Sequence, residues 1–419
     1  MHAQTAASLS PGERAIVAHV DRHAAQALAL LERAVNINSG TQNFDGVREA
    51  GRLFSTELES IGFRTSWVDG APFRRAGHLI AERPGAGPKV LLIGHLDTVF
   101  ERDSPFQKFE RLDETHARGP GIIDMKGGDV IIVQALKALA SAGALESLHV
   151  VVVMTGDEES AGDPQAAARE ALVAAAAGAR AAIGFEDGDG DPNTAVIGRR
   201  GTAAWTLRVT GTPAHSSQIF RPDIGYGAVF EAARILDRFR ETLAGEPHLT
   251  LNPALVLGGT QVEIDPVQAR GSAFGKDNVI AEHALASGDL RALSREQFAA
   301  ARTAMEQIVA RPLAGARATI AFEEGYPPLA PTEGNRRLLA MYDQVSRDLG
   351  QGPVGAVDPD RAGAADVSFI AGLVPMILDG VGLMGDGGHT VNETADLRTL
   401  PSQTKRAAIL LHRLASAGR

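Results

Sequence analysis

The stretch Val90-Leu91-Leu92-Ile93-Gly94-His95-Leu96-Asp97 decides the fold, because it joins a run of aliphatic residues to two polar residues. Such a run predicts a strand. In an extended chain the side chains of residues i and i+2 point to the same face, so His95 and Asp97 lie side by side. A metal-binding histidine commonly donates its second N–H to a carboxylate. The stretch therefore predicts a metal ligand, His95, that is oriented by Asp97.

Helix-like and strand-like segments alternate through much of the chain. In the helix-like segments, apolar residues recur every three or four positions. The strand-like segments are short apolar runs. This alternation predicts an α/β fold with a mixed, largely parallel sheet flanked by helices. The predicted helices are 12–36, 46–61, 129–141, 164–178, 335–348 and 401–415, and the predicted strands are 78–82, 89–94, 148–155, 181–185, 195–197 and 375–378.

A second pattern begins near Gly198-Arg199-Arg200-Gly201. From 204 to 210, apolar and polar residues alternate, as in a sheet with one exposed face. The order of the following segments, β-α-β-β-α-β, is typical of an α+β split βαβ domain. In this part, Asp223 and Ser294 are predicted N-caps of helices, and strands are predicted near 254–264, 278–291 and 317–323. We therefore expect a catalytic domain of residues 1–199 and 328–419, interrupted by a lid or dimerisation domain of residues 200–327.

The composition excludes several classes of protein. A chain of 419 residues exceeds what one hydrophobic core usually serves, which fits two domains. There are 51 acidic against 41 basic residues and no basic run with interleaved aromatics, so nucleic acid is not an expected partner. No apolar run approaches the roughly 20 residues of a membrane helix, which predicts a soluble protein that does not bind membranes. Because cysteine is absent, any metal must be held by His, Asp and Glu.

The first residues, Met1-His2-Ala3-Gln4, resemble the remnant of a small-x-small signal-peptidase site with an initiator methionine in front. This pattern predicts a periplasmic or secreted protein, and a cytoplasmic location is the alternative. The lack of cysteine is compatible with both.

Further candidate ligands follow other strand-like runs. In open α/β sheets, sites are built beyond the carboxyl ends of the strands. We therefore expect these side chains to converge. They are Asp124 in a glycine-rich turn, the pair Glu158 and Glu159 after 151–155, Glu186 after 181–185, and His389 near the end of the chain.

The neighbouring carboxylates Glu158 and Glu159 repel each other unless a cation lies near them. Adjacent residues of an extended segment point to opposite sides, so one carboxylate is free to bind a metal while the other acts as a general base. Asp124 lies in a turn whose glycines let the backbone approach a crowded centre, and a carboxylate there is suited to bridge two ions about 3.5–4 Å apart. Asp157 is interpreted as a residue that solvates the turn. The pattern predicts a two-metal hydrolase.

Five ordered segments carry a resemblance to a known family. They are Gly94-His95-Leu96-Asp97-Thr98-Val99, the stretch from Gly119 to Gly128, Gly156-Asp157-Glu158-Glu159-Ser160, Phe185-Glu186 and Gly388-His389-Thr390. Together they resemble the di-zinc metallopeptidase family of glutamate carboxypeptidase, acetylornithine deacetylase and succinyl-diaminopimelate desuccinylase, most closely its glutamate carboxypeptidase branch. The likeness covers nearly the whole chain. It implies hydrolysis of an amide or peptide bond, with release of a C-terminal amino acid from an N-acyl amino acid or short peptide.

The resemblance also implies the cofactor and the roles of the residues. The cofactor would be two Zn²⁺ per subunit, with Co²⁺ or Mn²⁺ as substitutes. The implied roles are His95 and Glu186 on one ion, Glu159 and His389 on the other, Asp124 as the bridge, Glu158 as the general base and Asp97 as the residue that orients His95.

Three residues of the inserted domain resemble positions that act on substrate. Gly211-Thr212-Pro213-Ala214-His215-Ser216 is similar to the family segment whose histidine steadies the oxyanion in the partner subunit's active site, which implies a homodimer through the inserted domain. Asn278 and Arg291 resemble substrate-contacting positions. The alternatives are a hydrogen-bonded turn residue for His215 and a salt bridge at the sheet edge for Arg291.

The substrate expectation rests on a departure from the family pattern. Glutamate-releasing relatives carry an additional arginine near the end of the insert, where this chain has Glu324-Gly325-Tyr326-Pro327. A glutamate side chain would therefore lose a cationic partner, and we expect a neutral or apolar leaving amino acid. Two alternative functions remain at this point: an aminopeptidase or dipeptidase of the same fold, and a catalytically silent metal-binding homologue.

Overall fold

The computed structural model describes residues 9–265 and 270–416, so Met1-His2-Ala3-Gln4 lies outside the described residues. The chain divides into two compact units. The first, unit 1, contains the chain up to Gly198 and again from Pro331. The second, unit 2, is Arg199–Ala330. Each unit has its own hydrophobic core.

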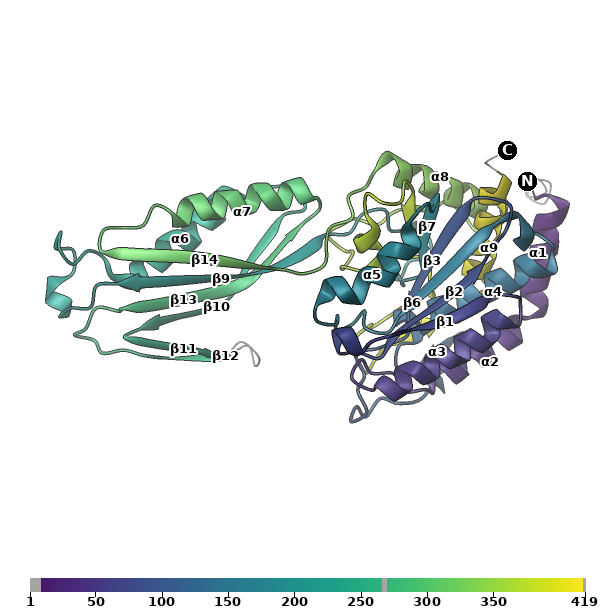
Figure 1. Ribbon diagram of the computed structural model, residues 1–419, viewed down its shortest axis with the longest axis horizontal. Helices are drawn as coiled ribbons and strands as arrows, with labels where there is room; N and C mark the ends of the chain where they lie inside the picture. Colours follow the sequence, from purple (N-terminus) through teal and green to yellow (C-terminus); the bar gives the residue numbers. More distant parts are fainter. Residues whose placement is uncertain (1–8, 266–269, 417–419) are drawn as a thin grey trace. The chain divides into compact units, whose positions relative to one another are not determined.

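A six-stranded mixed sheet forms the centre of unit 1 (Figure 1). Its strands are, in spatial order, β1 (Arg64–Asp69), β2 (Gly77–Arg83), β6 (His149–Thr155), β3 (Lys89–His95), β7 (Ala181–Gly184) and β16 (Ile377–Leu378). The last four pair in parallel, whereas β2 pairs antiparallel with both of its neighbours. The predicted α/β fold with a mixed, largely parallel sheet is therefore confirmed.

Helices pack against this sheet through apolar faces. Helix α3 contacts β1 and β2, α4 contacts β3, and α5 contacts β6. Helix α4 is buried along almost its whole length, because it also packs against α9 and α1. The helices of unit 1 are α1 (Pro11–Arg22), α2 (Ala24–Val35), α3 (Phe44–Glu59), α4 (Gly127–Ser141), α5 (Gln165–Ala176), α8 (Glu333–Asp348) and α9 (Thr399–Ser416).

Unit 1 differs from the sequence prediction at one helix and at several short strands, of which β1 is the longest. The single helix expected over 12–36 is two helices, because the backbone breaks at His23, whose φ is −108° and ψ is 12°. The apolar spacing continues in phase across this one residue, so the periodicity gives no sign of the break. Strand β1 was not predicted, since its sequence is mostly polar and only half-buried.

The parallel pairing fixes where polar loops meet. Ile93 of β3 lies opposite Val153 of β6 and Gly184 of β7, and His95 lies opposite Thr155. The carboxyl ends of the three strands therefore lie at one edge of the sheet. His95 and the loops that follow β6 and β7 are brought to that edge.

A small antiparallel sheet brings the C-terminal part of the chain to the glycine-rich turn. Its order is β17-β18-β5-β4. Of the two strands that flank His389, β18 pairs with β5, the strand that precedes Gly119, and β17 pairs with β18. These strands are β4 (Glu110–Arg111), β5 (His116–Arg118), β17 (Gly385–Asp386) and β18 (Thr394–Asp396). The remaining short elements of unit 1 are η1 (Ala71–Phe73), η2 (Ile122–Lys126), η3 (Leu145–Ser147), η5 (Asp366–Ile370) and the parallel pair β8 (Thr194–Ala195) and β15 (Gly355–Ala356).

Unit 2 is a four-stranded antiparallel sheet that two helices cover on one face (Figure 1). Trp205, Leu207 and Val209 alternate with more exposed residues and form its core with Ile235 and Phe239. The elements are β9 (Gly201–Gly211), η4 (Ser216–Gln218), α6 (Gly227–Leu243), β10 (Thr250–Gly259), β11 (Gln261–Asp265), β12 (Arg270–Phe274), β13 (His283–Ala292), α7 (Arg295–Val309) and β14 (Ala316–Glu324).

Unit 2 contains the predicted β-α-β-β-α-β order with one addition. The β11–β12 hairpin is inserted between β10 and β13. The strand expected near 254–264 is divided at Thr260 into β10 and β11, and β12 was not predicted. Ser294 caps α7 by accepting the Gln297 N–H, as expected. The prediction for Asp223 is wrong, because α6 begins at Gly227 and Asp223 pairs with Arg221 instead. Across the described residues of both units, no helix combines the length and apolar character that crossing a membrane requires.

Candidate metal centre

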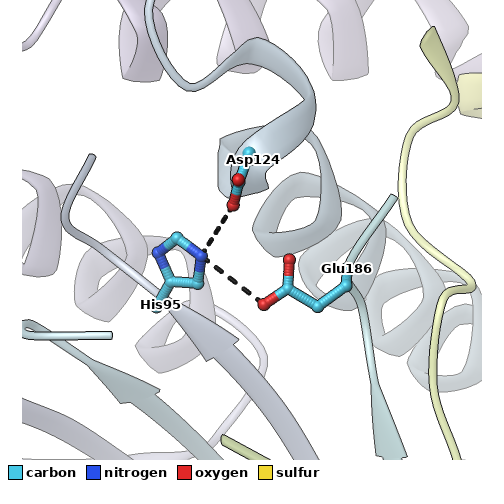
Figure 2. Close-up of side chains that lie close together, drawn as sticks. All are labelled: His95, Asp124 and Glu186. Atoms are coloured by element: carbon cyan, nitrogen blue, oxygen red, sulfur yellow. Dashed lines mark hydrogen bonds and ion pairs between the residues drawn. The ribbon is translucent and has the colours of Figure 1, made fainter. Parts of the chain in front are cut away.

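Three side chains from separate segments converge at the edge of the sheet. His95 ends β3, Asp124 lies in the turn before α4, and Glu186 follows β7 (Figure 2). The Nε2 atom of His95 lies 2.9 Å from Asp124 Oδ1 and 3.5 Å from Glu186 Oε1. His95 is buried, so its ring position is fixed by packing as well as by these contacts.

A second group shares Asp124. The Nε2 atom of His389 lies 2.9 Å from Asp124 Oδ2 and 3.1 Å from Glu159 Oε2. His389 has a φ of 64°, in the left-handed region that few non-glycine residues adopt. It follows Gly387, which has a φ of 77°. This tight turn aims the ring at Asp124.

The two groups fit a pair of metal ions. In each group one donor atom per residue lies within 4.8 Å of the others, and the two oxygens of Asp124 point to different groups. A tetrahedral ion with bonds of about 2.0–2.2 Å separates neighbouring donors by roughly 3.4 Å, close to the distances seen here. Glu159 Oε1 is buried and has no hydrogen-bond partner among the described residues. An oxygen of this kind is costly to bury unless a cation or proton satisfies it.

The charges of the centre also favour a cation. Burial lowers the pKa of His95, but Glu186, Asp124 and Asp97 overcome that effect and hold its pKa well above the ordinary value. Hydrogen bonds to Asp124 and Glu159 raise the pKa of His389 to about 11. Burial and the charge of Asp124 raise the pKa of Glu159 to about 7. The clustered carboxylates thus draw positive charge into the site, which is the condition for binding a divalent metal.

Asp97 has a wider role than the sequence suggested. His95 Nδ1 lies 3.0 Å from the Asp97 backbone oxygen and 3.5 Å from its Oδ1, so the main chain makes the closer contact. The Asp97 carboxylate accepts the backbone N–H groups of Glu158 and Glu159 at 3.0 and 3.1 Å, and the Thr41 hydroxyl at 2.7 Å. Asp97 therefore ties the loop with the two glutamates to the end of β3.

Glu158 belongs to neither donor group. Burial raises its pKa well above the ordinary value, and the nearby Asp366, Glu159 and Asp124 raise it further, against the opposing effect of His95. A carboxylate with a raised pKa beside a metal centre is suited to accept and return a proton.

Sequence reasoning missed a buried carboxylate that holds the glycine-rich turn. Glu393 accepts the backbone N–H groups of Gly121, Ile123 and Asp124 at 3.0, 2.9 and 3.3 Å. It is fully buried and follows His389 by four residues, so one short segment supplies a candidate ligand and also holds the turn that carries the shared Asp124. Its spacing from His389 is the only sequence signal, and spacing alone does not distinguish it from a surface residue.

The interpretation of Asp157 as a turn-solvating residue is wrong. Its side chain is fully buried and pairs with the buried Arg169 at 2.5 Å. The partner lies twelve residues away on α5, and no periodicity in the sequence links the two positions.

The three candidates of the inserted domain all lie in unit 2, and two of them are neighbours. The Ser216 N–H donates to the Asn278 carbonyl at 2.9 Å, and His215 is bridged to Val279, so His215 and Asn278 lie side by side and both are exposed. Arg291 lies at the other end of the sheet, on the order of 25 Å away along β13. There it pairs with Asp289 at 3.0 Å.

An α/β sheet with two carboxylate–imidazole groups sharing one aspartate defines a metal-dependent hydrolase. Residues 91–414 match the model of peptidase family M20/M25/M40. Because this match covers most of the chain, the protein belongs to that family and is a metallohydrolase.

Three similar proteins illustrate the relationship. The chain is 26% identical to carboxypeptidase G2 of Pseudomonas sp. (strain RS-16) over 388 residues, which are 91% of this chain and 87% of the relative. The structure of aminopeptidase PepT from Bacillus cereus ATCC 10987 has a TM-score of 0.74 at 18% identity, over 94% of this chain and 99% of that one. A dinuclear metal-binding M20 peptidase from Bacillus subtilis has a TM-score of 0.64 at 16% identity, with coverage of 94% and 99%.

Proposed function

We propose that the protein is a di-zinc carboxypeptidase or amidase that releases a C-terminal amino acid from an N-acyl amino acid or short peptide. The observation that carries the proposal is the pair of donor groups sharing Asp124, with Glu158 beside them but in neither. His95 and Glu186 would hold one Zn²⁺, and Glu159 and His389 the other. Co²⁺ or Mn²⁺ would be substitutes in the same donor set.

Each residue near the metals has a separate task in this proposal. Bound zinc supplies Lewis acidity for the carbonyl and for the attacking water. Glu158 takes the proton of that water and gives it to the nitrogen of the leaving amine. Asp97 keeps the Glu158 backbone in place through the N–H bond at 3.0 Å. Asn278 and Arg291 would bind the substrate. Because they lie on the order of 25 Å apart on unit 2, one small substrate would meet them from two different subunits of the proposed dimer.

The leaving amino acid is proposed to be neutral or apolar. The end of β14 and the residues that follow it carry no arginine where glutamate-releasing relatives have one. Glu324, the last residue of β14, is itself paired with Arg302 at 3.0 Å. Arg302 is therefore already paired with a carboxylate of this chain, so it is less able to pair with an acidic substrate side chain. This comparison supports an aliphatic or aromatic residue at the C-terminus of the substrate.

A release assay tests the reaction and the specificity together. The zinc-loaded protein is expected to hydrolyse N-acyl-phenylalanine or N-acyl-leucine with a kcat/KM at least about tenfold above that for N-acyl-glutamate, because one charge-assisted hydrogen bond contributes about 1.5–3 kcal/mol. Activity should disappear with a chelator and return with zinc. Preference for dipeptides with a free amine would instead identify an aminopeptidase or dipeptidase. No turnover of any substrate with both metals bound would identify a catalytically silent homologue.

A homodimer through unit 2 is part of the proposal. Phe220, Tyr226, Val229 and Phe230 form an exposed apolar cluster, in which the Phe220 ring lies 5.5 Å from Tyr226 and 5.9 Å from Phe230. Contiguous exposed aromatics are typical of protein interfaces and uncommon on monomers. They lie on α6 and the segment that joins it to His215, so an interface here would place His215 near a second subunit.

His215 is suited to donate a hydrogen bond to the oxyanion in that second subunit. Its Nδ1 lies 2.8 Å from the Ser217 hydroxyl and accepts the Ser217 N–H at 3.3 Å. An Nδ1 that accepts leaves the hydrogen on Nε2, so Nε2 is the donor. The donor would then face the carbonyl oxygen as it gains negative charge.

Mixing two inactive variants tests whether His215 acts across the dimer. His215→Ala and Glu158→Gln should each be nearly inactive alone. Refolded together in equal amounts, they should recover about a quarter of the wild-type activity, because half the dimers are mixed and each mixed dimer has one intact site. When Phe230→Glu is added to both variants, each should be monomeric in sedimentation and their mixture should recover no activity. Full activity of His215→Ala alone, or no recovery despite dimers, would contradict the role.

A further inference from the structure

A buried arginine lies behind the loop that carries Glu158. Arg169 of α5 is only 1% exposed, and its guanidinium contacts two buried carboxylates from different segments. Its Nη1 lies 2.5 Å from Asp157 Oδ1, and its Nε lies 2.8 Å from Asp366 Oδ1. A single planar cation therefore joins the loop after β6 to the start of η5.

The second oxygen of each carboxylate accepts a hydrogen bond from this loop or from the end of β6. Asp157 Oδ2 accepts the Gly162 N–H at 2.7 Å, and Asp366 Oδ2 accepts the hydroxyl of Thr155, the last residue of β6, at 2.6 Å. Arg169 Nη2 also donates to the Asp157 backbone oxygen at 3.1 Å. The segment from Thr155 to Gly162 is thus fixed at its beginning, at Asp157 and at its end.

A histidine adds a second connection between α5 and the loop. The buried His78 lies 2.7 Å, through Nε2, from the backbone oxygen of Ala168, the residue before Arg169. Its Nδ1 accepts the Gly156 N–H at 3.1 Å. The helix that carries Arg169 and the loop that carries Glu158 are therefore joined at Gly156, through His78, as well as at Asp157.

Hydrogen bonds hold the backbone of Glu158 at its own N–H and at the residue before it. Its own N–H is held by Asp97, and the residue before it is held by Arg169. Neither Arg169 nor Asp366 belongs to a donor group. The contacts thus constrain the backbone that carries the proposed base without using any metal ligand.

Charge balance explains why an arginine is needed at this place. Asp157 and Asp366 are both buried beside the glutamate pair, and unpaired buried carboxylates are costly. The planar guanidinium meets both carboxylates at once, which the ammonium of a lysine does less well. The arginine therefore allows two anchoring carboxylates to be placed behind the loop.

From these contacts we infer that Arg169, acting through Asp157 and Asp366, is a positioning residue that holds Glu158 where it exchanges the proton. The inference rests on the proposed function, since it needs Glu158 to be the base. In this inference, the residues that position Glu158 are different from the residues that bind the metal ions. Loss of Arg169 should lower the rate of the chemical step and leave substrate and zinc binding intact.

The test measures kcat, KM and zinc content separately for each variant and compares them with wild type. Arg169→Met is expected to lower kcat about 100-fold, the scale of a misplacement of roughly 1 Å, with KM within about threefold and two zinc ions per chain retained. Arg169→Lys, which restores the charge without the planar fork, should recover part of the lost kcat. Asp366→Asn keeps the shape of the side chain and should lower kcat about tenfold, again with both zinc ions.

The control is the exposed pair Arg74 and Asp163, which lies at the far end of the same loop. Arg74→Met should leave kcat unchanged. The inference is overturned if Arg169→Met keeps kcat within threefold of wild type, or if kcat and zinc content fall together. If Arg169→Met does not fold, Asp366→Asn decides: unchanged kcat overturns the inference. An active Glu158→Gln would instead overturn the proposed function itself.

Discussion

Glu158→Gln should lower kcat about 10⁴-fold while both zinc ions remain bound. The amide has the shape of the carboxylate but cannot accept a proton, and general acid–base catalysis contributes about 10²–10⁴-fold. Glu158 is used twice in the proposed reaction, once as base and once as acid, so its removal should reach the upper end of this range. Metal binding should persist because Glu158 lies in neither donor group.

The measurement combines steady-state kinetics on an N-acyl amino acid with zinc content of the purified variant. Glu146→Gln is the matched control, since Glu146 is an exposed glutamate of the same unit that pairs with Arg83. It should behave like wild type. Retention of more than a few per cent of activity in Glu158→Gln would remove Glu158 from the role of base, and loss of zinc would make it a ligand instead.

The parts of the site that follow parallel strands were predictable from sequence. Each run of aliphatic residues ends in a polar residue, and parallel strands place their carboxyl ends at one edge. His95, Glu159 and Glu186 are brought together for this reason. The same logic predicted the largely parallel sheet, because buried strands and amphipathic helices leave distinct periodic signals.

The contacts behind the site were not predictable in this way. Arg169 is bonded to Asp366, 197 residues away, and Glu393 is bonded to Ile123, 270 residues away. Such pairs leave no periodic pattern, and a charged residue in a loop is usually exposed. Strand β12 was missed because all of its residues are exposed and show no apolar alternation. Sequence periodicity thus reports burial on a core and does not report buried ion pairs.

Asp124→Ala should abolish the paired metal site and lower activity at least about 10³-fold. The variant removes one donor from each group, which leaves His95 with Glu186 and His389 with Glu159. Two protein donors per ion are fewer than zinc sites normally use. Zinc content should fall from two ions to below about one per chain, and several kcal/mol of transition-state stabilisation should be lost with it.

Thermal unfolding separates loss of metal from loss of fold. Wild-type protein should gain about 2.7 kcal/mol of stability for each bound ion at a zinc concentration 100 times the Kd, whereas Asp124→Ala should gain little. Without metal the variant should be less stable than wild type. Burial raises the pKa of Asp124, but its contacts with His389 and His95 outweigh burial and hold that pKa below the usual range, and the variant loses these contacts. Asp163→Asn, a change at an exposed carboxylate, should respond to zinc like wild type. If Asp124→Ala bound two zinc ions and kept its activity, the shared aspartate would not be the bridge, and the two donor groups would have to work independently.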